Sequence, residues 1–184
     1  VLGEGEEALA DLAESLDHPE EVTGIVYRYN GTVRKTEPRT LLNDLASLPW
    51  PSRELVDLEP YHIAGKRYTP VLTSRGCPKQ CAFCSNPLFM VSRFRQRTID
   101  DVCAAIFHCY DHHHIRIFDS EDDNFTCDGH RAEALLSSLI RGREERQFEI
   151  TAMNGLYYEA LNNKLVEMLA RAGMKKMNLS LVTS

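Results

Sequence analysis

The hydrophobic pattern of the chain is most regular from residue 70 onward, where short apolar runs alternate with longer amphipathic segments. The short runs have the length of strands, whereas the longer segments repeat apolar residues every three or four positions, as a helix requires. Alternation of this kind indicates a parallel sheet with right-handed crossover helices. The pattern predicts strands over residues 70–74, 115–119, 148–154 and 176–182, and helices over about 98–110, 130–142 and 159–171.

Each predicted helix carries a continuous apolar face. Thr98, with Asp101 three residues later, is a typical start of the first helix. Gly173 is a typical end of the third, since glycine accepts the left-handed backbone there. The three faces comprise Ile99, Val102, Cys103, Ile106 and Tyr110; Ala132, Leu135, Leu136, Leu139 and Ile140; and Leu161, Leu165, Met168 and Leu169.

Three strand–helix units and a further strand fill this region, whereas a complete eight-unit barrel needs about 250 residues. The predicted fold is therefore α/β, either a partial (βα) barrel with parallel strands or a truncated open sheet.

The N-terminal third of the chain has a different character. Leu9, Leu12 and Leu16 predict the apolar face of a helix, and Asn30-Gly31 between two β-rich runs predicts a hairpin. Residues 37–69 are rich in proline and read as an irregular linker with short helical turns. The predicted organisation is therefore a helix and hairpin over 1–36, a linker over 37–69 and the partial barrel over 70–184.

Composition restricts the class of protein only mildly. An apolar content of 43% and a charged content of 26% are ordinary for a globular protein. The net charge of −6 argues against nucleic acid as a partner. We see neither a secretory signal nor a run of about 18 apolar residues, so we expect a cytoplasmic protein without a membrane span. Because the chain begins at Val1, we expect a processed or excised fragment.

Three of the six cysteines, Cys77, Cys81 and Cys84, fall within eight residues with the spacing C-x3-C-x2-C. Three thiolates suit a 4Fe–4S cluster, whose remaining iron would stay open for a substrate or cofactor. Zinc is the alternative, with a nearby histidine or Cys127 as its fourth ligand. Two other cysteines, Cys103 and Cys109, fall in the predicted helix over 98–110, and we interpret them as small buried hydrophobic residues.

Polar segments follow every predicted strand. The cysteine loop follows the first strand, and the sequences DSEDDNF (119–125), MNGLYY (153–158) and TS (183–184) follow the others. Because the carboxyl ends of parallel strands meet at one rim, these segments predict a single active site there.

The segment RGCPKQCAFC, with Phe83 directly before the last cysteine, resembles the cluster loop of the radical S-adenosylmethionine (SAM) superfamily. The stretches GEGE, GIVYRYNGTV, LPWPSRELVDLEPYHIAGKRYTPVLTSRGCP, FRQRT and DDNFT resemble the subfamily that carries an N-terminal cobalamin-binding domain. The resemblance covers nearly the whole chain, and it makes residues 1–36 the tail of that domain with the hairpin.

The resemblance implies that Cys77, Cys81 and Cys84 hold a 4Fe–4S cluster and that SAM occupies its fourth iron. Reductive cleavage would give methionine and a 5′-deoxyadenosyl radical, with Phe83 near the adenine. It also implies a small-molecule substrate and a low-potential electron donor of the flavodoxin or ferredoxin type.

Further site residues follow from the same resemblance. The family places a polar contact to the SAM amino group at the second strand end, where Asp122 and Asp123 match best; a solvated turn or helix cap is the alternative. Asn154 matches an Asn-Gly turn of the family that approaches the ligand, although a plain turn would explain it as well. Tyr157 stands where the family often has arginine, so a carboxylate clamp is not expected there.

Two basic clusters have simpler explanations. Arg93, Arg95 and Arg97 either anchor the cysteine loop or the SAM carboxylate, or are surface arginines. The run His112–His114 follows a predicted helix, where positive charge is favourable, so we do not expect a metal site there.

Much of the family's pattern is missing. We expect the stretch that would bind cobalamin to be missing from this chain, and its barrel to stop short of the superfamily's strand number. We therefore expect the SAM and cluster half of a cobalamin-type radical SAM enzyme, either a fragment of a longer enzyme or a truncated product. Its reaction would be methyl transfer to unactivated carbon or a ring-forming or oxidative rearrangement. The alternatives are an iron–sulfur or zinc binding module without radical catalysis and a folded, inactive remnant.

Overall fold

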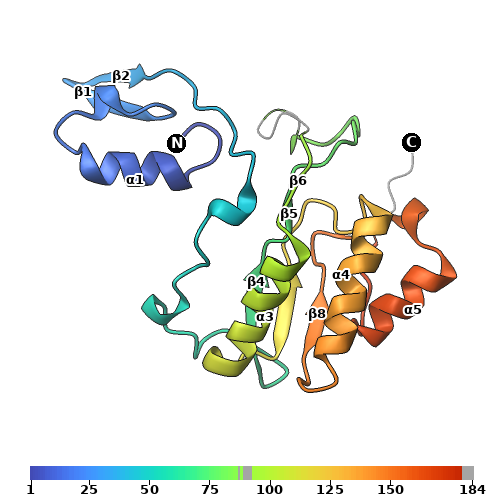
Figure 1. Cartoon of the computed structure of the whole chain (residues 1–184). Helices are drawn as coiled ribbons and strands as arrows, with labels where there is room; N and C mark the ends of the chain where they lie inside the picture. The colour runs from blue at the N-terminus through green and yellow to red at the C-terminus, as the bar shows by residue number, and fades with distance from the viewer. Residues whose placement is uncertain (87, 89–92, 180–184) are drawn as a thin grey trace. The chain divides into compact units, whose positions relative to one another are not determined.

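The computed structural model describes residues 1–86, 88 and 93–179 (Figure 1). The chain forms two compact units. One comprises residues 1–43 and the described part of 82–91, and the other comprises residues 44–81 and the described part of 92–184.

The N-terminal unit contains the predicted helix and hairpin. Helix α1 (Glu6–Glu14) is followed by a short turn, η1 (Pro19–Glu21), and by strands β1 (Val26–Tyr29) and β2 (Thr32–Lys35), which pair antiparallel. Asn30 and Gly31 both have positive φ, at 47° and 78°, as a tight hairpin turn requires.

The apolar face predicted for this helix is wrong in two positions. Ala8, one position before Leu9, is buried with Val22 and Ile25, while Leu9 itself is exposed. Leu12 packs against this small core, as predicted. Leu16 is 70% exposed because the helix ends at Glu14, before its side chain would return to the buried face.

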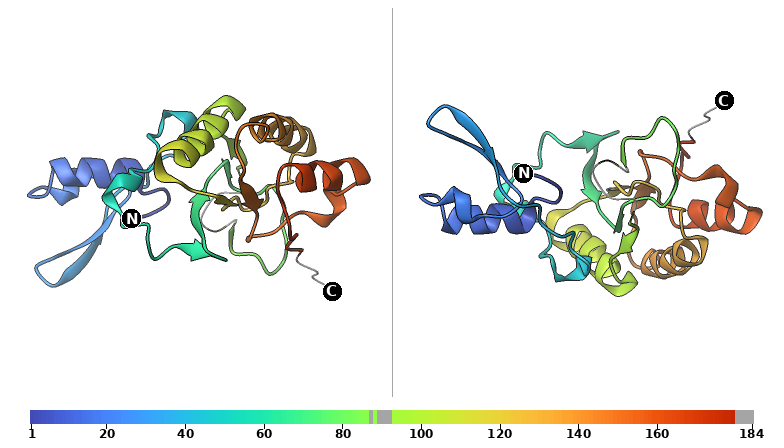
Figure 2. Two further views of the ribbon diagram at one scale, coloured as in Figure 1. Left: turned by 90° about the horizontal axis from the view of Figure 1, so that it is seen from below. Right: turned by 90° about the horizontal axis from the view of Figure 1, so that it is seen from above.

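The second unit is built on a four-stranded sheet in the order β3-β4-β7-β8. Strands β4 (Lys66–Val71), β7 (Ile117–Ser120) and β8 (Glu149–Thr151) are parallel, and β3 (His62–Ile63) adds an antiparallel edge. Helices α3 (Ile99–His113), α4 (Gly129–Gly142) and α5 (Asn163–Arg171) lie side by side around one side of the sheet (Figure 2). The predicted strand–helix alternation is confirmed, although the described sheet does not close into a barrel.

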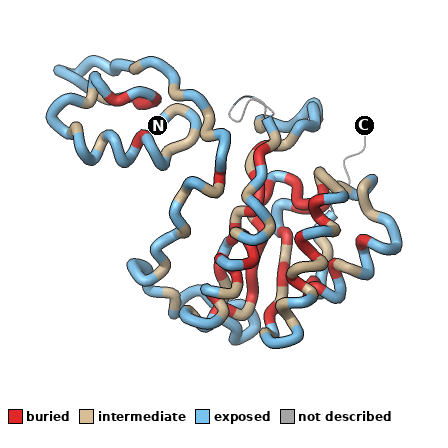
Figure 3. The backbone as a smooth tube through the Cα atoms, in the orientation of Figure 1, coloured by how far each residue is buried: buried red, intermediate tan, exposed pale blue. Residues whose placement is uncertain are grey.

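The core of this unit lies between the sheet and the helices, as the buried segments in Figure 3 show. Phe118 of β7 and Phe148 meet edge to face, with ring centroids 5.7 Å apart. The predicted helix faces supply most of the remaining core, and Cys103 and Cys109 are buried as predicted. Five predicted positions are only half-buried at its margin: Ile99, Tyr110, Ile140, Leu161 and Met168.

The first predicted strand is displaced and the third is shortened, because main-chain amides near their ends donate hydrogen bonds to side chains instead of to a neighbouring strand. The first occupies Lys66–Val71 instead of 70–74, since the Thr73 and Ser74 amides donate to the Asp122 carboxylate. The third ends at Thr151, since the Met153 amide donates to Asp119.

The other predicted elements differ at their ends. The third helix starts at Asn163 because residues 158–160 form a separate turn, η4 (Tyr158–Ala160), and Asn162 caps the helix by accepting from the Leu165 amide. In the fourth predicted strand, Leu179 forms one parallel bridge with Leu156, and residues 180–182 lie outside the described part.

Residues 44–69 pack onto the sheet unit. They include two short turns, η2 (Leu45–Ser47) and η3 (Arg53–Leu55). The Trp50 indole donates to the Asp101 carboxylate at 2.8 Å, and Arg53 donates to Thr69 at 3.0 Å. The predicted domain boundaries, after residues 36 and 69, stay predictions. Among the described residues, no helix combines the length and the apolar character needed to cross a bilayer.

Candidate iron–sulfur site

The cysteine loop leaves the sheet unit through a narrow base, which we call the neck. The neck consists of residues 73–76 and 95–97, in which β5 (Ser74–Arg75) pairs antiparallel with β6 (Arg95–Gln96). The Arg97 amide closes it by donating to the Thr73 carbonyl at 3.0 Å. The loop thus begins and ends at the carboxyl end of β4, on the rim where the sequence predicts the active site (Figure 1).

Asp122 and Asp123, which follow β7, hold the outgoing side of the neck. The Asp122 Oδ1 atom accepts from the Thr73 and Ser74 amides at 2.7 and 2.9 Å, and its Oδ2 atom accepts from the Thr73 hydroxyl at 2.5 Å. Asp122 is only 1% exposed. Asp123 is exposed, and its Oδ2 atom accepts from the Gly76 amide at 2.7 Å. The structure therefore brings both predicted acids to the root of the cysteine loop.

Arg131, in the first turn of α4, contacts both strands of the neck. Its guanidinium donates to the Thr73 hydroxyl at 3.1 Å, to the Thr73 carbonyl at 2.8 Å and to the Arg97 carbonyl at 3.2 Å. Burial lowers the pKa of Arg131, while the charges of Asp122 and Asp128 oppose that shift. Sequence reasoning missed this residue, because nothing local distinguishes it from a surface arginine of an amphipathic helix.

Gly76, directly before Cys77, occupies a position that only glycine fits. Its φ is +81°, and a β-carbon there would lie 2.2 Å from the Arg93 carbonyl oxygen. The loop therefore makes its first turn against its own returning main chain.

The returning side of the neck is held by Arg97, which donates to Asp101 at 2.6 Å and to the Leu72 carbonyl at 3.3 Å. These contacts fit the hypothesis that an arginine anchors the loop, with Arg97 in that role. Arg95 is buried and Arg93 is exposed, so the surface interpretation fits only Arg93.

The three candidate ligands are all free thiols. Cys77 is half-buried, whereas Cys81 and Cys84 are exposed, and the Cys84 sulfur accepts from the Asn86 amide at 3.4 Å. Within the described residues, no group of three His, Cys, Asp or Glu side chains is placed to hold a metal ion. The donor chemistry nevertheless fits a thiolate-bound cluster, because clusters take cysteine sulfur and none of these thiols is consumed in a disulfide. The assignment of the three ligands stays a prediction.

Two further residues surround Cys77. The Asn124 amide nitrogen lies 4.0 Å from its sulfur, and Asn124 is buried. Cys127, considered above as a fourth zinc ligand, is half-buried. Burial raises the pKa of Cys127 to about 11, with the neighbouring Cys77 as the next cause.

The remaining strand ends are linked to one another. Asp119 is buried and accepts from the Thr151 hydroxyl at 2.7 Å, so it joins β7 to β8. Asn154 is exposed, and its amide nitrogen donates to the Glu121 carbonyl and carboxylate at 3.2 and 3.0 Å. These contacts gather the predicted polar segments on one rim.

Tyr157 and Phe83 complete the set of predicted positions. The ammonium group of Lys79, in the cysteine loop, lies 4.1 Å from the centre of the Tyr157 ring, a cation–π contact. Tyr157 therefore holds the loop at the position where the family often has arginine. Phe83 is 68% exposed, and its role near adenine stays a prediction.

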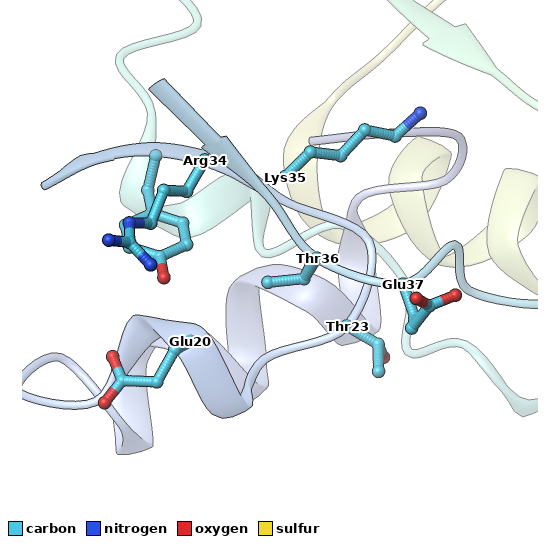
Figure 4. A pocket seen from close by; sticks show the side chains of 7 residues that line it. Glu20, Thr23, Arg34, Lys35, Thr36 and Glu37 are labelled. Atoms are coloured by element: carbon cyan, nitrogen blue, oxygen red, sulfur yellow. The ribbon is translucent and has the colours of Figure 1, made fainter. Parts of the chain in front are cut away.

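The N-terminal unit carries a separate shallow groove of about 470 Å³ (Figure 4). Glu20 and Arg34 lie toward one end of it, and Thr23 and Glu37 toward the other. Because charges of both signs line it, the groove favours no particular ligand.

The sequence of the chain is similar to those of known enzymes. No family model matches the chain. It is 34% identical over 135 residues to an uncharacterized methyltransferase of Pyrococcus horikoshii, across 72% of this chain and 29% of that protein. It is 32% identical over 132 residues to the anaerobic magnesium-protoporphyrin IX monomethyl ester cyclase of Synechocystis, across 68% of this chain and 26% of that protein.

Among solved structures, the fold matches the radical SAM methyltransferase TsrM from Kitasatospora setae, solved with cobalamin and a 4Fe–4S cluster bound. The TM-score is 0.71 at 18% identity, over 95% of this chain and 36% of TsrM. This likeness shows a shared fold. The homologues of the chain are cobalamin-binding radical SAM enzymes, and the chain spans less than a third of the length of the two relatives named above.

Proposed function

We propose that this chain is the part of a cobalamin-type radical SAM enzyme that binds the 4Fe–4S cluster and one side of SAM, within the first half of a (βα) barrel. One observation carries the proposal. Three free thiols, Cys77, Cys81 and Cys84, belong to a loop whose base is fastened to the carboxyl ends of parallel strands. Catalytic groups of parallel βα folds gather at that end.

In this proposal the three thiolates each bind one iron and leave the fourth iron to SAM. When bound, the cluster would supply the electron that cleaves SAM to methionine and a 5′-deoxyadenosyl radical. The residues of this chain hold and orient both groups.

Asp123 is the better candidate for the ammonium group of SAM, because it is exposed at the root of the loop. A carboxylate opposite an ammonium gives a strong, charge-assisted hydrogen bond. Asp122, the other predicted contact, already accepts three hydrogen bonds from the neck. Asn154, on the neighbouring strand end, is exposed and would complete the polar edge of the SAM site.

The full-length protein is proposed to add a cobalamin domain, the remaining barrel strands and a small-molecule substrate site. Methyl transfer is the proposed reaction, since one relative is named a methyltransferase, and ring formation is the second candidate, since another is a cyclase. A thiolate-bound cluster requires a reducing compartment, so we propose the cytoplasm, with a flavodoxin- or ferredoxin-type electron donor.

The test is to reconstitute the chain anaerobically with iron and sulfide, reduce it, and record its EPR spectrum with and without SAM. We expect a reduced 4Fe–4S signal that changes when SAM is added. Cys77→Ala, Cys81→Ala and Cys84→Ala should each lose the cluster absorbance, and Cys103→Ala is the matched control because that thiol is buried in the core.

Other outcomes would separate the alternatives. A cluster signal indifferent to SAM would leave an iron–sulfur module or an inactive remnant. Bound zinc without a cluster would refute the proposal. Asp123→Asn should weaken SAM binding without loss of iron, and an unchanged SAM affinity would refute the role given to Asp123.

A further inference from the structure

The neck of the cysteine loop contains a buried polar chain that the proposed cofactors do not explain. The Arg131 guanidinium donates to the Thr73 hydroxyl at 3.1 Å, and that hydroxyl in turn donates to Asp122 at 2.5 Å. The Thr73 hydroxyl thus links a buried cation to a buried anion. We propose that Asp122, Thr73 and Arg131 form a preassembled clamp that fixes the neck before any cofactor binds. In this inference, which rests on the proposed function, Asp122 and Arg131 are positioning residues for the cluster ligands.

The clamp provides hydrogen bonds to main-chain groups of the neck, which lie beyond the end of β4. Strand β4 ends at Val71, yet Thr73 and Ser74 beyond it are buried. The Asp122 carboxylate accepts hydrogen bonds from the Thr73 and Ser74 amides, and the Arg131 guanidinium donates to the carbonyls of Thr73 and Arg97. Since buried main-chain groups must be hydrogen-bonded, these side chains determine where the loop leaves and rejoins the fold.

Burial makes this arrangement sensitive to the loss of one member. Asp122 is 1% exposed and Arg131 is 8% exposed. Removing one partner leaves the other charge buried without compensation, whereas removing both takes away both desolvation costs. A double substitution should therefore disturb the neck less than the worse of the two single substitutions.

The clamp matters for the cluster because the ligands follow it directly. Gly76 ends the outgoing side of the neck, and Cys77 is the next residue. A loop whose ends are already fixed loses less conformational freedom when its thiolates are bound. Loosening the neck should therefore accelerate cluster loss without removing any ligand.

The sharpest variant is Thr73→Val, which replaces the hydroxyl with a methyl group of similar size, with Thr73→Ser as the matched control. We would measure the rate at which a chelator removes iron from the reconstituted chain, and the EPR line shape. Thr73→Val should lose iron about tenfold faster or more, the factor expected for losing hydrogen bonds to charged groups. Thr73→Ser should stay close to the wild-type rate.

Hydrogen exchange on the chain without a cluster tests the clamp independently. The amides of Thr73, Ser74 and Gly76 should be protected in the wild-type chain and in Thr73→Ser, and should exchange faster in Thr73→Val. Arg131→Met should resemble Thr73→Val. Arg141→Met is the control for charge removal, because Arg141 is an exposed arginine of the same helix.

The outcomes distinguish the clamp from the function on which it rests. Wild-type exchange and wild-type iron loss in Thr73→Val would overturn the clamp. If the wild-type chain assembles no cluster, the proposed function fails, and exchange alone decides: faster exchange in Thr73→Val supports the clamp, and equal exchange refutes it. A double variant, Asp122→Asn with Arg131→Met, that is worse than either single variant would refute the charge coupling.

Discussion

Replacing Gly76 with alanine tests the geometry of the neck most directly. Gly76 combines a positive φ of +81° with main-chain contact, since a β-carbon would lie 2.2 Å from the Arg93 carbonyl oxygen and 2.9 Å from its carbon. Main-chain atoms cannot move aside as the end of a flexible side chain can. Relieving this contact requires the neck to shift, which would break the hydrogen bond from the Gly76 amide to Asp123.

Two other glycines of the same unit separate the contributions. Gly65 has a φ of +72° and open space where a β-carbon would stand, and Gly129 has neither a positive φ nor a nearby atom. Gly65→Ala should lower the free energy of unfolding by about 1 kcal/mol. The left-handed backbone costs alanine about 1–2 kcal/mol, and the lower conformational entropy of the unfolded variant offsets part of that cost. Gly129→Ala should stay within about 0.5 kcal/mol of wild type. Gly76→Ala should cost about 3 kcal/mol or more, once the lost charge-assisted hydrogen bond is added.

The assay is urea unfolding followed by tryptophan fluorescence. Trp50 is the single tryptophan, and it lies in this unit with its indole bonded to Asp101, so its emission reports the fold in question. A Gly76→Ala midpoint equal to that of Gly65→Ala, at the same denaturant slope, would show that the contact with Arg93 does not constrain the neck.

Two further predictions concern titrating groups. Burial, with His108 and Arg53 as further causes, holds the pKa of His113 below its ordinary value of 6.5. As the pH falls below 6.5, the unfolded chain therefore binds more protons than the folded chain, and the free energy of unfolding decreases until the pH reaches the lower folded-state pKa. Because His113→Gln removes this titrating group, the urea midpoints of the variant should depend less on pH in that range. Burial also raises the pKa of Cys103 to about 11 and that of Cys127 to about 11. Iodoacetamide at about pH 8 should therefore leave both unlabelled while the exposed Cys81 reacts, as mass spectrometry would show; rapid labelling of Cys103 would contradict its burial.

The sequence predicts the elements of this fold well where the residues that determine an element are close together in the chain. Asn30-Gly31 gives the hairpin because its two positive φ angles are a property of those residues. Thr98 starts α3 because its hydroxyl accepts from the Asp101 amide three residues later. The strand ends fail for the opposite reason: the carboxylates of Asp119 and Asp122 capture amides far away in sequence, and periodicity carries no information about such contacts.

The same distinction divides the site. The cysteine spacing is a local pattern, so the candidate ligands could be named from the sequence, together with the rim on which their loop stands. Asp122 and Asp123 look equivalent in the sequence, yet the structure buries one in the neck and leaves the other exposed. Asp122 is bonded to Thr73 and Ser74, which are distant in sequence and come beside it only once β4 and β7 have paired. A motif therefore identifies which acids stand at the loop, whereas packing decides which of them is buried against it and which is exposed.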